Sequence, residues 1–465
     1  MSADEPVESL FRRESGRMVA VLTRVFGVHN LSLVEDVVQD AFCRAMEVWQ
    51  FRGMPDAPAA WLMTVAKNRA LDALRRERTA RTFAPELTRL LESEWTLVST
   101  LDEQFAPLAI KDDVLRLMFS CCDPRIGEDS QVALVLHMLC GFSVDEVAGA
   151  FVASHAAMEK RLTRAKKVLV QAAQLFDTAD TAGFSSRLPA VQRVIYLLFN
   201  EGYHGASPQF AVRASLCQEA MRLAGLLQEH PLGSTPATDA LAALMCLDAA
   251  RLPARTDAAG DLVALPDQDR AKYDRDLLAE GDRLLQRAAR GPELTTYHVE
   301  AAIAWVHTSA VRGEDTDWTR IVTLYDMLMS VRPSPVVALN RAIAVAQLEG
   351  PEAGLKAIAE IEHRDKLARY PFFPAALGEL ELRAGRPAAA RPHFREALRL
   401  ARNPAERRFL QQREIACAGG APDVVPASAV RASSSAGPRR PARPAPSAPG
   451  PSPSPSPPSR PVPSG

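Results

Sequence analysis

The sequence lacks several features that define common protein classes. No run of about 18 uncharged apolar residues occurs, so a transmembrane helix is not expected. The first 13 residues carry acids where a signal peptide has a basic start and an apolar core, so export is not expected. Only seven cysteines are present, and they are scattered. This pattern excludes a disulfide framework and fits a reducing cytoplasm.

Catalytic and metal-binding motifs are also absent. The chain has no Walker loop and no GxGxxG, GxSxG or HExxH motif. Cys121 and Cys122, with His137, lack the CxxC spacing of a zinc site, and core packing explains them better. We therefore expect no catalytic residue, no cofactor and no metal. No sequence motif supports the alternative that the C-terminal part is an enzyme.

Charge is balanced overall but uneven along the chain. The 55 basic residues nearly match the 56 acidic ones. Residues 66–81, however, contain six Lys or Arg against two acids, and residues 154–167 contain five against one. Two short basic stretches in an otherwise acidic chain indicate localised contact with phosphate. The alternative is a pair of solvated helix faces.

The fold class predicted from the pattern is all-α. Apolar residues recur at three- and four-residue spacing, and no run alternates with period two. Breaks between helices are expected at glycines and prolines near Gly202, Pro231, Pro253, Gly291, Pro333, Gly350 and Gly385. From about Ala418 the chain is rich in Pro, Ser and Ala, with almost nothing to bury, which predicts a disordered tail.

The spacing of apolar residues in segment 33–49 predicts an amphipathic helix with one apolar and one polar side. Its apolar stripe is Val34, Val38, Ala41, Ala45 and Val48. Asp36, Gln39, Asp40 and Cys43 are three or four residues apart and share the opposite side. A loop broken by glycine and prolines follows at residues 51–58.

A second helix is predicted from Ala60 to about Arg78. Its outer face combines Asn68 and Asp72 with arginines, and Trp61 stands at its start. Phosphate charge beside an aromatic stacking surface is what the capture of single-stranded nucleic acid requires. The alternative is an ordinary amphipathic helix with Trp61 in the core.

The segment 130–170 predicts a helix-turn-helix. Ser143 and Glu146 form a capping box that opens a two-turn helix at residues 144–151. Ser154 is the expected N-cap of a second, basic helix. A short capped helix, a tight turn and a basic helix suit docking in the DNA major groove. A helical hairpin without a ligand is the alternative.

Together these segments resemble the extracytoplasmic-function (ECF) type of RNA polymerase sigma factor. Residues 33–42, LVEDVVQDAF, resemble region 2.2 of that family. Residues 61–76 resemble regions 2.3 and 2.4, and residues 141–148 with 161–166 resemble region 4.2. The resemblance covers about the first 170 residues, and no counterpart of domain 3 of larger sigma factors is visible.

The resemblance implies three sets of site residues. Core RNA polymerase would be bound by Asp36, Gln39 and Asp40. The single-stranded minus-ten element of promoter DNA would be held by the loop at 51–58 and by Trp61, Lys67, Asn68, Arg69, Asp72, Arg75 and Arg76. The minus-thirty-five duplex would be read by His155, Ala156, Lys160, Arg161, Arg164 and Lys167.

This chain has some 245 helical residues more than a minimal member of the family. Residues 193–203 resemble the start of the C-terminal extension in a subgroup that carries a tetratricopeptide-like domain. Near the end, Leu377, Gly378, Ala390, Phe394 and Ala397 match positions of a 34-residue helical repeat. In that subgroup the extension takes part in regulation, which implies a protein partner and no membrane-bound one.

The predicted organisation has five parts. They are region 2 (1–81), a linker (82–113), region 4 (114–172), an all-α, tetratricopeptide-like regulatory domain (173–417) and the tail (418–465). The predicted function is that of a cytoplasmic sigma factor. The runner-up is a helical-repeat adaptor that binds DNA without polymerase. The face of Asp36, Gln39 and Asp40 discriminates between them, because an adaptor does not need it.

Overall fold

The computed structural model confirms an all-α fold. It describes residues 4–77, 110, 112–151, 153–171, 181–204, 212–257, 261–401 and 404–418. In these ranges the only strand-like pairing is an isolated bridge between Thr256 and Leu262. None of the described helices is both long enough and apolar enough to cross a membrane. The predicted tail lies outside the described residues.

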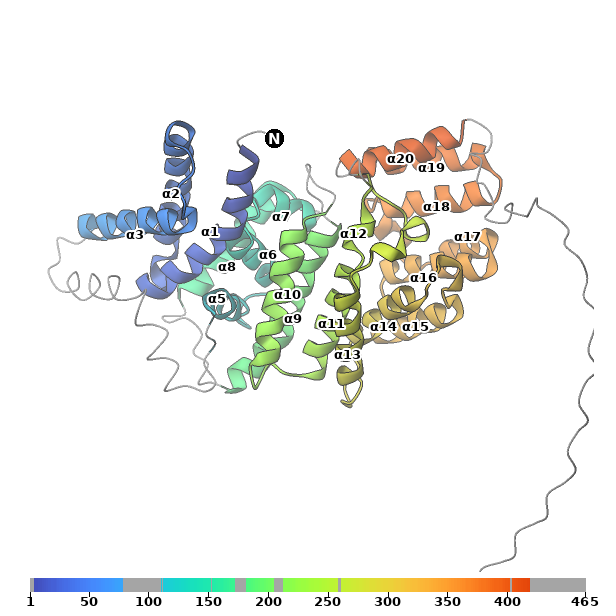
Figure 1. The fold of residues 1–465 in the computed structure, drawn as a ribbon, viewed down its shortest axis with the longest axis horizontal. Helices are drawn as coiled ribbons and strands as arrows, with labels where there is room; N and C mark the ends of the chain where they lie inside the picture. Colours follow the sequence, from blue (N-terminus) through green and yellow to red (C-terminus); the bar gives the residue numbers. More distant parts are fainter. Residues whose placement is uncertain are drawn as a thin grey trace, which may run out of the picture. The chain divides into compact units, whose positions relative to one another are not determined.

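Two groups of helices build the N-terminal part (Figure 1). The first group is α1 (Asp4–Phe26), the short 3-10 helix η1 (Val28–Asn30), α2 (Leu31–Arg52) and α3 (Pro58–Glu77). The second group is α5 (Asp113–Cys121), α6 (Glu128–Leu139), α7 (Val144–Ala150) and α8 (His155–Val170). Most of the linker predicted between them lies outside the described residues.

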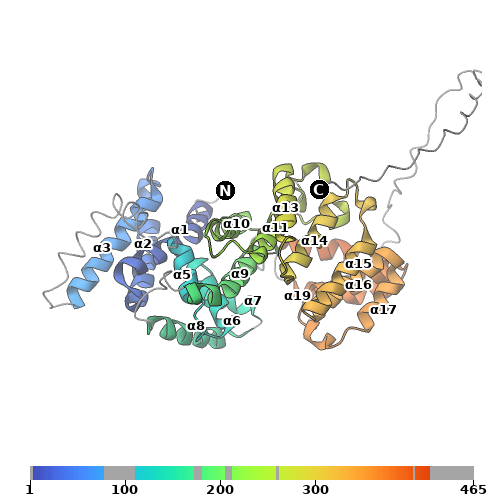
Figure 2. The ribbon, with the colours of Figure 1, turned by 90° about the horizontal axis from the view of Figure 1, so that it is seen from below.

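The C-terminal extension continues with helices that pair along the chain. They are α9 (Thr181–His204), α10 (Ala214–Glu229), α11 (Pro236–Ala249), α12 (Leu252–Arg255), α13 (Arg275–Ala288), α14 (Thr296–Ser309), α15 (Trp318–Val331), α16 (Pro335–Glu349), α17 (Pro351–Ala359), α18 (Phe372–Arg383), α19 (Pro387–Leu400) and α20 (Pro404–Ala416). Two views show α9 beside α10, with α11 next to them (Figures 1 and 2).

The hydrophobic core is one continuous cluster in the first part of the chain and is divided into small clusters after it. One continuous cluster of buried apolar side chains runs from Leu10 in α1 to Ala304 in α14. Beyond it, three small clusters follow one another, each shared by neighbouring helices of α14–α20. Helices that bury their apolar faces only against the next neighbour are typical of stacked helical repeats.

The best-matched repeat positions lie where such a repeat would use them. Ala390, Phe394 and Ala397 of α19 are at most 1% exposed. Gly378 in α18 faces the Phe394 ring so closely that a Cβ at this position would lie 3.1 Å from it. The small residue therefore lets α18 and α19 approach each other. Whether these hairpins are tetratricopeptide repeats stays a prediction.

The helix break predicted near Gly202 is confirmed, because α9 ends at His204 and α10 begins at Ala214. Gly202 itself lies within α9. A Cβ on Gly202 would lie 2.8 Å from the Cys217 sulfur and 2.9 Å from the Cys217 nitrogen. The glycine is thus explained by the close approach of α9 to the start of α10, which is a tertiary contact and leaves no local signal.

Candidate nucleic-acid interface

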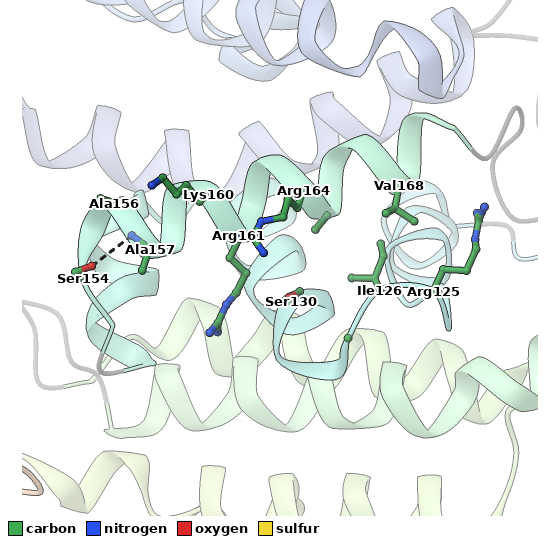
Figure 3. A pocket seen from close by; sticks show the side chains of 12 residues that line it. Arg125, Ile126, Ser130, Ser154, Ala156, Ala157, Lys160, Arg161, Arg164 and Val168 are labelled. Atoms are coloured by element: carbon green, nitrogen blue, oxygen red, sulfur yellow. Dashed lines mark hydrogen bonds between the residues drawn. The ribbon is translucent and has the colours of Figure 1, made fainter.

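The α7–α8 unit is held by two helix caps, both predicted from the sequence. The Glu146 amide donates to Ser143 Oγ at 3.2 Å, and the Ser143 amide donates to the Glu146 carboxylate at 2.9 Å. At the start of α8, the Ala157 amide donates to Ser154 Oγ at 3.3 Å (Figure 3). Each cap satisfies amides that the first turn of a helix leaves without a partner. The caps therefore fix the starting residues of both helices.

Helix α8 buries one stripe and exposes the opposite one. Met158, Leu162, Ala165 and Leu169 are at most 3% exposed. The residues predicted to contact DNA lie away from this stripe: His155, Ala156, Lys160, Arg164 and Lys167 are exposed, and Arg161 is half-buried. Figure 3 shows Lys160 and Arg161 leaving the helix in different directions.

The cations of α8 are available to an outside partner. Across the described ranges, no ion pair forms at Lys160, Arg161, Arg164 or Lys167. The Arg161 guanidinium lies 5.7 Å from the centre of the Phe151 ring, which orients it. A cavity of about 610 Å³ is lined in part by Lys160, Arg161 and Arg164. Cations without acidic partners on a capped helix form a surface suited to phosphate and to base edges.

His155 is tied to the preceding helix. Its Nδ1 lies 2.6 Å from Asp145 Oδ1 of α7, and both side chains are exposed. The hydrogen bond and the negative charge of Asp145 raise the pKa of His155. The charged imidazole therefore persists to a higher pH than an isolated one, at the end of α8 that enters the groove in this type of unit.

Helix α2 presents the predicted acidic face to the outside. Asp36, Gln39, Asp40 and Cys43 are all exposed, whereas Val34, Val38, Ala41 and Ala45 are at most 3% exposed. The two sides of α2 are thus divided as the periodicity predicts. Of the predicted stripe, only Val48 is half-buried.

Helix α3 meets this face directly. Arg69 Nη1 lies 3.4 Å from Asp40 Oδ2, and both side chains are about half exposed. One residue assigned to the minus-ten element is therefore paired with one assigned to polymerase. Asn68 and Asp72 are exposed, and Lys67 is half-buried. Arg75 and Arg76 belong to the last turns of α3, but their side chains fall outside the described part of the chain.

Trp61 is neither fully buried as a core residue nor fully exposed as a stacking surface. The residue is half-buried, and its ring lies 5.4 Å from that of Trp49 at an angle of 57°. Part of the indole thus belongs to the core between α2 and α3. The exposed aromatic residue nearby is Phe51, at the end of α2, with 85% of its surface accessible. It lies in the segment predicted to hold single-stranded DNA.

Comparison with known proteins identifies the family. Residues 10–80 match the family described as sigma-70 region 2, and residues 187–289 match DUF6596, a family of unknown function. The protein named ECF RNA polymerase sigma factor SigX of Bacillus subtilis is 24% identical over 145 residues, which are 30% of this chain and 71% of SigX. RNA polymerase sigma factor CarQ of Myxococcus xanthus is 30% identical over 148 residues, 31% of this chain and 76% of CarQ.

The chain belongs to the ECF sigma factors. A Rhizobium meliloti protein named "Uncharacterized protein R00370" is 39% identical over 400 residues, which are 84% of this sigma factor and 91% of that protein. This relative therefore shares most of the extension as well. No solved structure matches the chain.

The sigma factor's other polar clusters are structural. Among the described residues, no group of three or more His, Cys, Asp or Glu could hold a metal ion. Cys121 and Cys122 are at most 1% exposed, and burial raises the pKa of the Cys122 thiol to about 12. His298 is buried and receives a hydrogen bond from the Thr295 amide as part of a capping box.

Sequence reasoning missed one set of contacts of this sigma factor. Lys166 of α8 forms an ion pair with Glu35 of α2 at 2.7 Å, and each side chain is about one quarter exposed. The two residues are 131 positions apart. No local sequence pattern predicts such a pair. The helical period places both residues at the boundary of the core and does not show which residue each one contacts.

Proposed function

We propose that this sigma factor directs core RNA polymerase to specific promoters. Core polymerase binds the exposed face of Asp36, Gln39 and Asp40. The minus-ten element binds as a single strand at α3 and the loop at 51–58. The minus-thirty-five duplex binds α8. The protein acts in the cytoplasm, where both partners are found.

The observation that supports this most strongly is the form of α8. Its N-terminal turn is capped by Ser154 and its apolar stripe is buried, whereas Lys160, Arg164 and Lys167 are exposed without acidic partners in the described ranges. In addition, the separate exposed acidic face on α2 favours a polymerase-binding protein over a DNA-binding adaptor.

The first experiment asks whether the chain binds core polymerase. Purified full-length protein is mixed with purified core enzyme and separated by size-exclusion chromatography. We expect a stable complex that then retains promoter DNA. Retention of promoter DNA by the chain alone, with no complex with core enzyme, would favour the adaptor.

We further propose that the extension modulates transcription. Supporting this, the extension packs directly on the DNA-reading unit: Arg213, at 7% exposure, lies 3.7 Å from Glu146 of the capping box. A change in the extension can therefore reach the helix cap of α7.

Two truncations test the regulatory role. Ending the chain at about Ala418 removes only the tail, and we expect stability and transcription to stay nearly unchanged. Ending it at about Pro371 deletes α18–α20 and exposes the core residues that they cover, so we expect loss of stability and altered transcription. Transcription is compared at matched soluble concentrations. Equal activity of both truncations would contradict regulation by the extension and leave the sigma assignment intact.

A further inference from the structure

At the start of α5, α6 and α7, acidic residues pair with arginines of the extension. Asp112 is the N-cap of α5, and its carboxylate lies 2.7 Å from Arg222 of α10. Glu128 and Asp129 open α6, and both pair with Arg193 of α9. Acids are favoured at this end of a helix because they offset the partial positive charge of its free amides. The arginines of the extension are thus second partners of residues that already start these helices.

Arg213, the residue before α10, completes this pattern at α7. Its Nη1 lies 3.7 Å from Oε1 of Glu146. The other oxygen of this carboxylate, Oε2, accepts the Ser143 amide of the capping box at 2.9 Å. The Arg213 guanidinium also lies 4.7 Å from the centre of the buried Phe142 ring. One side chain of the extension therefore contacts both the cap of α7 and the turn that leads into it.

Arg213 is itself held in place by the extension. Its side chain is 7% exposed, and its Nη2 lies 2.5 Å from Oε1 of Glu201, near the end of α9. Its amide donates to the Gly202 carbonyl at 2.7 Å, and its carbonyl accepts from the Leu216 amide at 3.0 Å. Exposed ion pairs contribute little to stability because two mobile side chains must be ordered. For the contact with α7, the surroundings of Arg213 have already ordered one of the two.

The helix that Arg213 contacts is joined to α8 by the adjacent residue. Asp145 of α7 lies 2.6 Å from His155 of α8, whereas its neighbour Glu146 faces the extension. His155 is the first residue of α8, at the end predicted to enter the major groove. The first turn of α8 contains no acid of its own. A displacement of α7 is therefore expected to displace the base-reading end of α8.

We infer that Arg213 is a positioning residue for promoter reading, which acts on DNA through α7 and not by touching DNA. It fixes the cap of α7 and, through the pair of Asp145 and His155, the orientation of α8. The inference rests on the proposed function, because it takes from it the reading of the minus-thirty-five duplex by α8. With Arg193 and Arg222 bound to the starts of α6 and α5, the DNA-reading unit is assembled on the extension.

Arg213→Ala tests the inference in the full-length chain bound to core polymerase. A duplex selected from a random library by the wild-type complex is the probe, and an unselected duplex is the reference. We expect the ratio of the two affinities to fall about 3- to 10-fold in the variant. Arg213→Lys keeps the charge without the planar fork that reaches two carboxylates, so it should restore part of the ratio. Arg283→Ala is the matched control, because Arg283 is exposed and pairs with Glu280 of its own helix.

Two further variants separate positioning from a purely structural role. Glu146→Gln keeps an oxygen for the capping box but removes the charge that faces Arg213. We expect it to lower the affinity ratio less than Arg213→Ala does, with the free energy of unfolding nearly unchanged. Asp145→Ala cuts the link to α8, so adding Arg213→Ala to it should lower the ratio less than in the wild-type background. A residue that acts independently of this link would cause the same loss in both backgrounds.

The outcomes separate the two proposals. Failure of the wild-type chain to select any duplex together with core polymerase would contradict the proposed function. Successful selection by the wild type, with an unchanged ratio in Arg213→Ala and Glu146→Gln, would overturn the positioning role alone. Equal losses from Arg213→Ala with and without Asp145→Ala would overturn it as well. Where Arg213→Ala does not fold, Glu146→Gln decides the test, because it leaves the capping box in place.

Discussion

The two halves of this sigma factor use charge in opposite ways. In α2 and α8, acidic and basic side chains are exposed, and across the described ranges Lys160, Arg161, Arg164 and Lys167 of α8 have no acidic partner. In the extension, several arginines form ion pairs with acidic residues of the extension itself. Arg287 pairs with the buried Asp239, Arg413 pairs with Glu379, and Arg408 pairs with Asp261. The first half exposes these charges to solvent, whereas in the second half such pairs connect helices of the extension.

This difference predicts two classes of variant. Charge removal in the extension should reduce the free energy of unfolding without a direct effect on recognition. Charge removal on α2 or α8 should reduce recognition without affecting stability, because exposed charges contribute little to folding. Each experiment below sets one class against the other.

The largest effect is expected for Arg287→Ala. Asp239 is 5% exposed and accepts both from Arg287 Nε at 2.6 Å and from Gln228 at 2.8 Å. Loss of the guanidinium leaves a buried carboxylate with a reduced set of donors, at a cost of about 3 kcal/mol. Denaturant unfolding measures the loss, with the exposed Arg290→Ala as control. Unchanged stability would show that this pair does not hold the extension together.

A comparable effect on the free energy of unfolding is expected from a change of pH, through the carboxyl group of Glu300. Burial raises the pKa of this carboxyl to about 7, against the opposing effect of a hydrogen bond from Tyr196. Because the folded protein keeps the proton to a higher pH than the unfolded chain, this contribution is complete below about pH 4.5 and is lost as the pH rises to about 7. A shift of the pKa from 4.5 to about 7 corresponds to a loss of roughly 3 kcal/mol.

Glu300→Gln removes this titration. The stability of wild type relative to the variant should fall between pH 4.5 and 7 and stay level above that. Unfolding titrations of both proteins at four pH values test it. A constant difference across the range would mean that the carboxyl of Glu300 titrates normally.

On α2, the double charge reversal Asp36→Arg with Asp40→Arg should weaken binding of core polymerase about 10- to 100-fold, or 1.4–2.8 kcal/mol. Both residues are exposed, so the free energy of unfolding should stay nearly constant. Asp36→Arg alone separates direct binding from the loss of the pair between Asp40 and Arg69. Wild-type affinity of the double variant would show that this face does not bind polymerase.

On α8, Arg161→Ala or Lys160→Ala should reduce discrimination between promoter and random DNA by about 1–3 kcal/mol if the side chain contacts a guanine. Lys167→Ala, a phosphate contact in this account, should weaken binding evenly and lower the salt slope by about one. Fluorescence titrations at several salt concentrations distinguish them. Equal losses on both DNAs for all three variants would mean that α8 reads no bases.

The smallest effect is the pH dependence of DNA binding through His155. Asp145 raises the pKa of this imidazole, so its positive charge is present at low pH and is lost as the pH rises above the ordinary value of about 6.5. Affinity for promoter DNA should therefore fall modestly over this range. Asp145→Asn should move the fall to lower pH, and identical profiles would contradict the role of Asp145.

The periodicity of the sequence was sufficient for the helices and for their local chemistry. The apolar stripe of α2, the capping box at Ser143 and the N-cap at Ser154 follow from spacing of three and four residues, and each is confirmed. The site residues stay predictions, although the exposed positions on α2 and α8 are compatible with them.

Contacts between distant segments could not be predicted in the same way. The pair of Glu35 and Lys166, the tilted ring contact of Trp61 with Trp49 and the approach of Gly202 to Cys217 depend on how helices pack. A glycine that permits two backbones to meet looks, in one sequence, the same as a glycine that ends a helix. Packing decides between them, and packing is not a local property.

The most direct test of the central claim is transcription by purified core RNA polymerase on a library of DNA fragments, with and without the full-length chain. The account predicts transcripts that start at defined sites sharing two elements about 25 base pairs apart, only when the chain is present. The Asp36→Arg with Asp40→Arg variant should strongly reduce them. The absence of chain-dependent start sites with the wild-type chain would contradict the account.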